Sequence, residues 1–413
     1  MSPFDTLTPT PARATLVRRL RGCLPDVAAF AGALLVAVLG ALLLGSLPGC
    51  GGGVGGEGTG SFASGTISGY GSIIVNGVHF DERNAQRVDD EGNPLRSEDL
   101  ALGMVVQVSG GAIRSAADGS PSAVAQSVRT QRALVGPAGT PDLAAGRLRV
   151  LGQTVAVSAD TVFDDRLAGG LAGIVAGQRL EVYGFYDASR AVYAATRIAP
   201  AAVAGTRLSG PLSSVDSGAG SVTLGGQTYR LAAGSTLGGL AAGTVARLDL
   251  QPAGDDPDRW EVRAGAGSSE GAPADREGAG LEGLVGTVLS STRFVVNGVT
   301  VDTSAARIDG TVQPGAQVEV SGALRAGVLL ASKVEARSAG TRLFELKGPI
   351  ASLDRAGQRF VLRGTTVSYA RADLRFDAPA SAAGLAVGRA LKVEGVLSAD
   401  RTVLEATRIR FDD

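Results

Sequence analysis

The sequence carries a motif that recurs five times, and this repeat limits the possible folds more than any other feature. Its first landmark is a pair of short apolar runs joined by a tight turn, clearest where Asn76-Gly77 separates residues 73–75 from 78–80. Asn-Gly between apolar runs predicts a β-hairpin, because both residues of a type I′ turn need positive φ. The nearly constant spacing of the corresponding glycines is typical of a tandem repeat. They are Gly77, Gly152, Gly226, Gly298 and Gly364.

The second landmark is an apolar segment bracketed by glycines, as in residues 315–322 and 388–395. Apolar and polar residues alternate inside it, which predicts a strand with one face on a core and the other in water. The third repeat has Leu250 where the closing glycine would fall, so the motif is weaker there. Each repeat ends in one more short apolar strand, such as residues 331–334.

Each repeat therefore predicts a strand, a two-stranded hairpin, a short turn or helix, the bracketed strand and a final strand. Residues 97–100 and 380–385 are the candidate helical turns. Five short strands with one small insert predict an all-β chain, a tandem array of about five small OB-like β-barrels after a signal peptide. A small two-sheet sandwich is the alternative. Units of this size are near the lower limit for independent folding, so neighbouring barrels are expected to pack together.

Composition places the boundaries between these units. Residues 264–280 contain Gly, Ala, Ser and acidic residues but no large apolar residue, which predicts a flexible linker between a three-unit and a two-unit block. The predicted segments are a signal peptide at 1–49, a Gly-rich tether at 50–60, β units at 61–131, 132–201 and 202–263, the linker at 264–280, and β units at 281–340 and 341–413.

The N-terminus has the layout of a secretory signal. Four arginines precede an uncharged apolar run over residues 27–47, and the run ends at Leu47-Pro48-Gly49-Cys50. This ending resembles the lipobox of bacterial lipoproteins, in which the Cys thiol is acylated and the Cys becomes the first mature residue. Cys50 is therefore the predicted lipidation site, and Gly51 after it favours the periplasmic face of the outer membrane. Pro48 and the length of the apolar run keep an uncleaved transmembrane anchor as the alternative.

Composition excludes several classes of function. The chain has one His and two Cys, which leaves little material for a metal site or for a Ser/His/Asp or Cys/His catalytic group. Its net charge of −1 argues against a nucleic-acid partner, which would require a basic surface. We therefore expect no enzyme activity, no cofactor and no metal.

His79 and two acidic runs are candidate metal ligands. His79 alternates with Val78 and Phe80 and has no second ligand nearby, so a solvent-facing strand residue is expected. The acidic run Asp89-Asp90-Glu91 lacks the ligand spacing of a Ca²⁺-binding loop, so a solvated turn is expected. The same interpretation applies to a second acidic loop, which contains Asp255, Asp256 and Asp258.

Aromatic residues concentrate in the second repeat, where Tyr183, Tyr186 and Tyr193 are candidate ligand-binding residues. Val182 should face the core, so Tyr183 should face outward. Exposed rings of this kind can stack on a sugar or a peptide. The alternative, which we favour, is that the rings pack against an adjacent barrel or a loop.

Together, Cys50 with its Gly tract and the repeated Val-Asn-Gly-Val, Gly-x-x-Val-x-Val-x-Gly and Ala-x-x-Val motifs resemble proteobacterial lipoproteins with tandem copies of the domain-of-unknown-function family 5666. The resemblance covers most of residues 60–413 and is strongest in the first, second and fourth repeats. It implies a cell-envelope protein of small β domains and brings no catalytic residues.

The expected function is therefore a lipid-anchored, non-enzymatic scaffold or binding array. Its expected partners are the membrane, through the N-terminal lipid, and envelope proteins or glycans. The alternatives are a carbohydrate- or peptide-binding protein that uses the aromatic patch, or an uncleaved membrane-anchored protein of the same architecture.

Overall fold

A computed structural model describes residues 60–116, 118–236, 239–254, 256, 258–267, 274–337 and 342–412. The predicted signal peptide, Cys50 and residues 50–59 of the tether lie outside these ranges. The described residues belong to one compact unit. None of the helices within them is long and apolar enough to cross a membrane.

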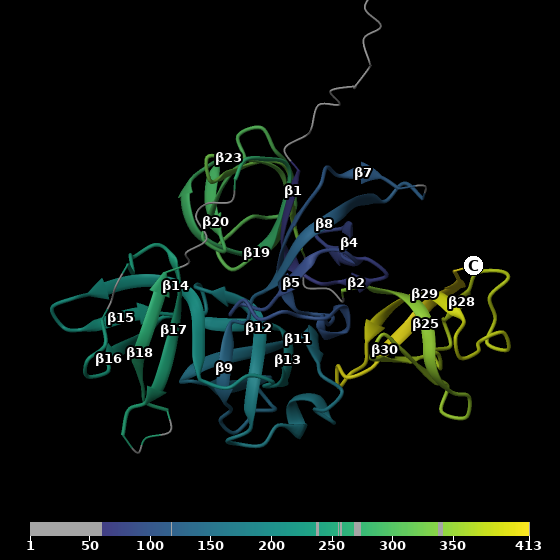
Figure 1. Ribbon diagram of the computed structural model, residues 1–413, viewed down its shortest axis with the longest axis horizontal. Helices are drawn as coiled ribbons and strands as arrows, with labels where there is room; N and C mark the ends of the chain where they lie inside the picture. Colours follow the sequence, from purple (N-terminus) through teal and green to yellow (C-terminus); the bar gives the residue numbers. More distant parts are fainter. Residues whose placement is uncertain are drawn as a thin grey trace, which may run out of the picture. The chain divides into compact units, whose positions relative to one another are not determined.

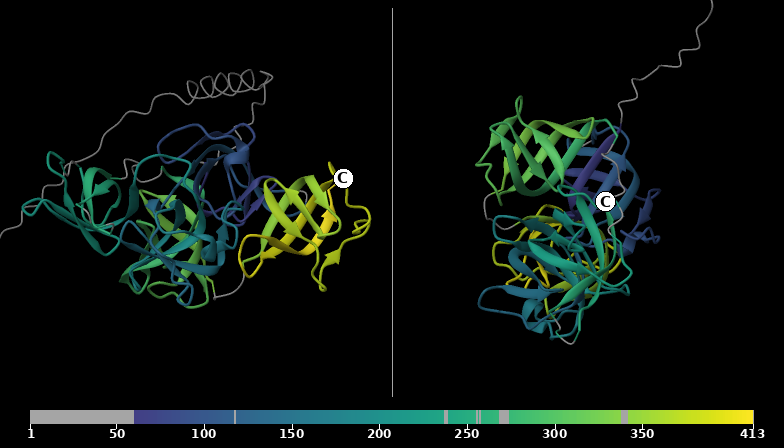
Figure 2. Two further views of the ribbon diagram at one scale, coloured as in Figure 1. Left: turned by 90° about the horizontal axis from the view of Figure 1, so that it is seen from below. Right: turned by 90° about the vertical axis from the view of Figure 1, so that its left-hand side faces the viewer.

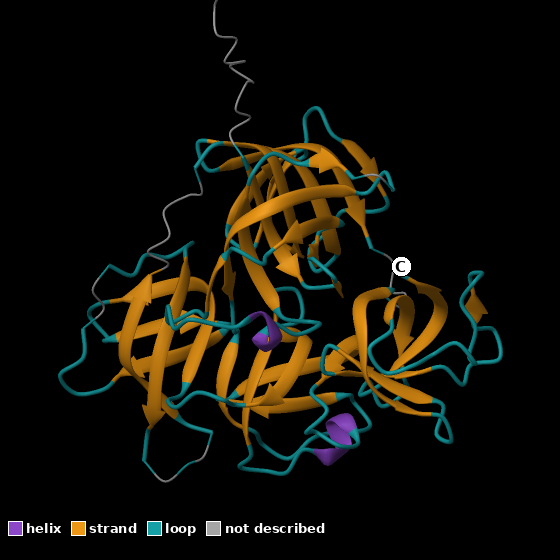
Figure 3. Ribbon diagram, turned by 45° about the vertical axis from the view of Figure 1, so that its right-hand side comes forward, coloured by secondary structure: helices purple, strands orange, loops and turns teal. Residues whose placement is uncertain are grey.

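The described part of the chain is all-β, as predicted, with thirty strands and two single-turn 3₁₀ helices (Figures 1 and 3). The strands form five consecutive barrels. The strands of barrels 1 and 2 are β1 (Ser61–Thr66), β2 (Gly69–Tyr70), β3 (Ile73–Val75), β4 (Val78–Asp81), β5 (Gln86–Val88), β6 (Val105–Gly110), β7 (Arg114–Ser115) and β8 (Pro121–Thr130), then β9 (Leu134–Pro137), β10 (Arg147–Val150), β11 (Gln153–Phe163), β12 (Arg179–Asp187) and β13 (Val192–Pro200).

Barrels 3, 4 and 5 follow the same pattern. Their strands are β14 (Arg207–Asp216), β15 (Ser221–Leu224), β16 (Gln227–Leu231), β17 (Val245–Pro252) and β18 (Trp260–Gly267), then β19 (Arg276–Ser290), β20 (Arg293–Val296), β21 (Val299–Asp302), β22 (Arg307–Asp309), β23 (Gln317–Arg325) and β24 (Val328–Ala336), then β25 (Phe344–Asp354), β26 (Arg359–Leu362), β27 (Thr365–Ser368), β28 (Arg375–Phe376), β29 (Ala390–Leu397) and β30 (Leu404–Phe411).

Barrels 3, 4 and 5 close their sheets through the same strand order. In barrel 3 the ring runs β14, β15, β16, β18, β17 and back to β14, with the β16–β18 pair parallel and the other pairs antiparallel. Barrels 4 and 5 repeat this ring, and Figure 1 looks into the ring of β19, β20 and β23. Closure removes free strand edges. The OB-like prediction is confirmed, and the sandwich alternative is wrong.

The closing glycine of the bracketed strand lies at a β-bulge. The register with the final strand shifts at Gly184 in barrel 2 and at Gly322 in barrel 4. A Cβ on either glycine would collide with a carbonyl oxygen of the opposite strand, so only glycine permits this close approach. Barrel 3 has the same shift beside Leu250, so the bulge is kept where the glycine is not.

The hairpin turn is held by a second glycine that sequence analysis did not single out. In barrel 4 the Asn297 side chain donates to the Glu282 carbonyl at 2.8 Å, and a Cβ on the neighbouring Gly283 would lie 2.5 Å from the Asn297 amide. Barrel 1 repeats the arrangement, since Asn76 donates to the Ser64 carbonyl at 3.1 Å. The turn Asn therefore closes the hairpin over the first strand only where that strand carries glycine.

Three apolar clusters make up the core. One joins barrels 1 and 5 and includes Tyr183 and Phe185 from barrel 2. A second joins barrels 2 and 3, and the third lies within barrel 4. Figure 2 shows the barrels from two further directions. Two cores thus cross barrel boundaries, as expected for units too small to bury enough apolar surface alone.

The predicted linker at 264–280 is wrong at both ends. Strand β18 continues to Gly267 and β19 begins at Arg276, while residues 268–273 are not described. The first residues of β19 pair in parallel with β1, and β25 pairs with β2, so the predicted three-unit and two-unit blocks are joined through barrel 1. Small residues serve close packing here, because a Cβ on Gly278 would lie 2.9 Å from Ile113.

One predicted helical turn is confirmed and the other is wrong. Ser97–Asp99 forms a single 3₁₀ turn. Residues 380–385 form hydrogen-bonded turns without a helix, and the second 3₁₀ turn is instead Gly170–Gly173 in barrel 2.

The hydrogen bond from Asn297 over Gly283, which we call the hairpin lock, predicts different effects for two glycines of strand β19. Gly283→Ala should push Asn297 away from its acceptor and lower the free energy of unfolding by about 1–3 kcal/mol. Gly286→Ala should change it by about 0.5 kcal/mol or less, because a Cβ there would lie 3.5 Å from its nearest neighbour. Urea unfolding of both variants measures the difference, and equal effects would show that the lock is unimportant.

Candidate functional site

The predicted ligand-binding tyrosines do not form an exposed patch. Tyr183 faces away from the core of its own barrel, as alternation requires, but it is only 3% exposed because barrels 1 and 5 cover it. It lines a cavity of about 560 Å³ between barrels 1, 2 and 5. The expectation that this ring is free to stack on a sugar or peptide is therefore wrong.

The other two tyrosines pack against barrel 3. Tyr193 is fully buried and donates its hydroxyl to the Ser209 carbonyl at 3.1 Å. Tyr186 is half-buried, with its ring centroid 5.1 Å from that of Tyr193. Gly210 leaves room for the Tyr193 hydroxyl, since a Cβ there would lie 2.5 Å from it. Interdomain packing, the interpretation favoured from sequence, accounts for both rings.

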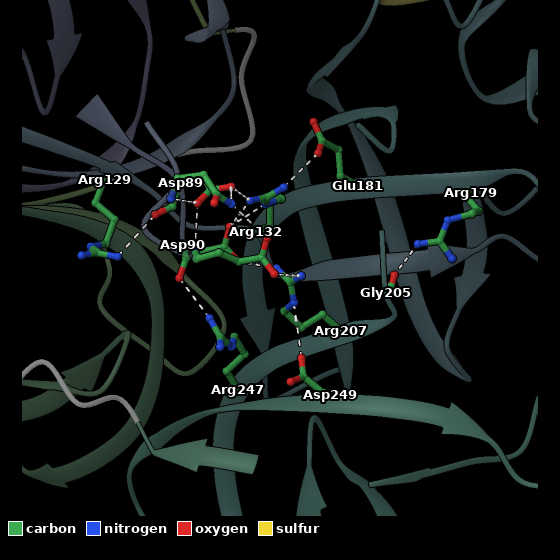
Figure 4. Close-up of polar contacts among 12 residues, drawn as sticks. Asp89, Asp90, Arg129, Arg132, Arg179, Glu181, Gly205, Arg207, Arg247 and Asp249 are labelled. Carbon is green, nitrogen blue, oxygen red and sulfur yellow. Dashed lines mark hydrogen bonds and ion pairs between the residues drawn. The ribbon is translucent and has the colours of Figure 1, made fainter. Parts of the chain in front are cut away.

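The acidic run of barrel 1 is a buried junction, and the expectation of a solvated turn is wrong (Figure 4). Asp89 and Arg132 are each 5% exposed, and an Arg132 nitrogen lies 2.7 Å from an Asp89 oxygen. Arg132 Nε also donates to Asp90 at 2.6 Å. Because Arg132 immediately precedes barrel 2, these pairs tie barrel 1 to barrel 2.

The same loop contacts barrel 3. Arg207 lies 3.1 Å from the Asp90 carboxylate and also pairs with Glu91. Arg247 donates to the Asp90 backbone carbonyl at 3.0 Å. Three consecutive acidic residues of one barrel thus meet arginines that belong to the next two, and we call this set of contacts the acidic junction.

The charges in the acidic junction are mutually compensated. Burial would raise the pKa of Asp89, but hydrogen bonds from Asn93 and Arg132 outweigh it and hold that pKa below its usual value. Burial also works against the charge of Arg132, but Asp90 and its other partners raise the Arg132 pKa overall. Removing one member would leave a buried charge without a partner, which costs about 3–5 kcal/mol.

A second buried ion pair joins other barrels. Glu282 on β19 is 1% exposed and pairs with Arg342, which precedes barrel 5. Its carboxylate also accepts from the Thr66 amide of barrel 1 at 3.0 Å and from Gln317 at 2.9 Å. The Arg342 amide in turn donates to Asp160 of barrel 2 at 2.6 Å. We call this set the Glu282 junction.

The remaining sequence candidates lie at surfaces. His79 is half-buried beside a groove, with its Nδ1 3.4 Å from the Ser72 hydroxyl, and burial lowers its pKa. Asp256 and Asp258 are exposed, and Asp255 is not described. Within the described ranges, no three His, Cys, Asp or Glu side chains are grouped as metal ligands.

Comparison with known proteins finds a family model that matches three of the five repeats. The family described as Domain of unknown function (DUF5666) matches residues 141–199, 282–335 and 347–410, which lie in barrels 2, 4 and 5. No curated protein matches the chain. A solved structure titled "drosophila Unr CSD456" covers 51% of this chain and 99% of its own length, at 13% identity and a TM-score of 0.13.

The Glu282 junction predicts a pH-dependent loss of stability for Glu282→Gln. Burial alone would raise the pKa of Glu282, but Arg342 and the Thr66 amide hold it below the ordinary value of 4.5. The ionised group therefore stabilises the fold above that value, and this contribution is lost as pH falls through the lower folded-state pKa. At neutral pH the variant should be about 3–5 kcal/mol less stable. Urea unfolding from neutral to acid pH should show the difference shrink.

Glu181→Gln is the matched control for that experiment. Burial raises the pKa of Glu181, and the attraction of Arg132 only partly offsets it. Ionisation of Glu181 at neutral pH therefore opposes folding, and its neutral replacement should cost little stability. If both variants lose the same stability at every pH, the assignment of Glu282 as the stabilising carboxylate fails.

Proposed function

We propose that this DUF5666 repeat-containing protein is a lipid-anchored, non-enzymatic scaffold of the bacterial cell envelope, attached through Cys50 to the periplasmic face of the outer membrane. Its barrels would present binding surfaces for other envelope proteins, in the order in which the barrels follow one another along the chain. Several weak contacts presented together gain strength through effective concentration.

The observation that carries the proposal is the set of contacts made by barrel 1. This barrel follows the predicted tether. It pairs with β19 of barrel 4 and β25 of barrel 5, and its acidic loop contacts barrels 2 and 3. An anchored first barrel that contacts the other four suits a protein that presents them together.

The charged and aromatic side chains that form the contacts between barrels also favour a scaffold over a catalyst. Asp90, Glu282 and their arginine partners are buried in ion pairs between barrels, and the tyrosines of barrel 2 pack against neighbouring barrels. These buried ion pairs and rings thus hold barrels together.

The anchor is tested by Cys50→Ala. We expect the variant to lose labelling by a fatty-acid probe and to leave the membrane fraction, because acylation requires the thiol. Retention in the membrane with an intact N-terminus would contradict lipidation and support the transmembrane alternative.

The scaffold role is tested by crosslinking and pull-down from envelope extract. The lipidated protein should recover specific protein partners, and Arg132→Ala should lose them because it disrupts the acidic junction. Arg83→Ala is the control, since its pair with Asp81 is exposed and contributes about 1 kcal/mol or less. Recovery of no protein partner, or conversion of an envelope component by the purified protein, would overturn the proposal.

A further inference from the structure

Barrel 5 carries a row of three cations on adjacent strands. Lys347 on β25 lies opposite Lys392 on β29, and Lys392 lies opposite Arg410 on β30. Like charges directly opposite each other in a sheet repel and lower stability. A row of three cations therefore does not contribute to the stability of the barrel.

The same three positions differ in charge from barrel to barrel. In barrel 4 they are Glu282, Glu319 and Glu335. In barrel 3 they are Ser209, Arg247 and Ala266. Glu282 and Arg247 use these positions to contact other barrels. The row in barrel 5 instead lines an open groove against barrel 1.

This groove, of about 620 Å³, is formed on its other side by the usual ligand face of an OB barrel. Such barrels bind oligonucleotides and oligosaccharides over strands two and three and over the loops between strands one and two and between strands four and five. In barrel 1 those elements supply Ser72, His79 and Asp81 and the turn with Asp118 and Ser120. The three cations of barrel 5 thus face a preformed ligand surface.

The cations are unequally compensated. Lys392 lies 2.6 Å from Glu345, and Lys347 lies 2.9 Å from Asp412. Arg410 has no ion pair with any residue in the described part of the chain, and neither has Arg114, which lines the opposite wall. Asp81 and Asp118 in the groove are already bonded to Arg83 and Ser120. The groove therefore contains cationic side chains available to an anionic ligand, beside hydroxyl and carboxylate groups that can accept hydrogen bonds.

We propose that the groove between barrels 1 and 5 binds an acidic oligosaccharide, whose anionic groups lie against Lys347, Lys392 and Arg410. Sugar hydroxyls would donate to the oxygen-bearing side chains of barrel 1, such as Ser72 and Asp118. No Phe, Tyr or Trp lines the groove, whereas single-stranded nucleic acids are held by stacking on such rings. An acidic glycan matches both the charge and the hydroxyl-rich wall.

The test is isothermal titration calorimetry of the full-length protein in detergent with tetragalacturonate. We expect binding that weakens as salt is added, because salt screens the attraction between the ligand carboxylates and the cations of this open groove. The methyl ester of the same tetramer keeps its ring hydroxyls but lacks the carboxylate charges, and should bind at least about tenfold more weakly. A short oligothymidylate should bind more weakly than tetragalacturonate.

Variants assign the site. Arg410→Gln should weaken tetragalacturonate binding by about threefold or more, and the double variant with Lys347→Gln by about tenfold or more. Arg408→Gln is the matched control on the same strand, because Arg408 pairs with Asp377 and does not line the groove. Arg410→Gln should also leave the melting temperature unchanged or raise it, since it relieves like-charge repulsion.

Equal affinity for the ester, tighter binding of the oligothymidylate, or unchanged affinity in the double variant would overturn the proposal. A fall in melting temperature for Arg410→Gln would indicate a structural role for the row and would also count against it. The proposal is independent of the scaffold role, because purified protein suffices for the titration and no protein partner is involved.

Discussion

The contact on which the described structure depends most is the acidic loop of barrel 1 between arginines of barrels 2 and 3. A buried carboxylate is costly without a cation, and a buried guanidinium is equally costly without an acceptor. Asp90 meets Arg132, Arg207 and the Arg247 side chain at once, so separating any of the three barrels exposes or strands a charge. The apolar cores shared across barrel boundaries act in the same direction. Small units with little core of their own thereby become one compact unit.

The fold of each barrel could be predicted from sequence because it follows local rules. The contacts between barrels could not be predicted in this way. Asn76-Gly77 and the bracketing glycines act within a few residues of themselves, through positive φ or a missing Cβ, so their pattern indicates the hairpins and the bulges. In the sequence, the run Asp89-Asp90-Glu91 looks like a solvated turn, because the arginines that pair with it are not its neighbours. Arg207 lies more than a hundred residues further along the chain. Alternation predicts the side of the strand on which Tyr183 lies, but it cannot show that another barrel covers that side.

One backbone position serves different purposes in different repeats. The position of Glu282 in barrel 4 corresponds to Lys347 in barrel 5, since each precedes the glycine that faces the hairpin turn. In barrel 4 the side chain is buried in an ion pair, and in barrel 5 it faces an open groove. The conserved geometry of the repeat fixes where the side chain points. The charge at that position, and the neighbour it meets, then decide whether the barrel face holds another barrel or is available to a ligand.

The most direct measurement of the central claim is hydrogen–deuterium exchange on the full-length protein with Asp90→Asn. If the acidic junction holds the barrels together, exchange should rise by about tenfold or more in β9, β12 and β14 as well as in the loop itself, because a stranded buried charge costs well over the free energy of a tenfold change. Asp81→Asn, in an exposed pair of the same barrel, should leave those strands protected. An increase confined to residues 89–93 would contradict the account, since barrels 2 and 3 would then be stable without the junction.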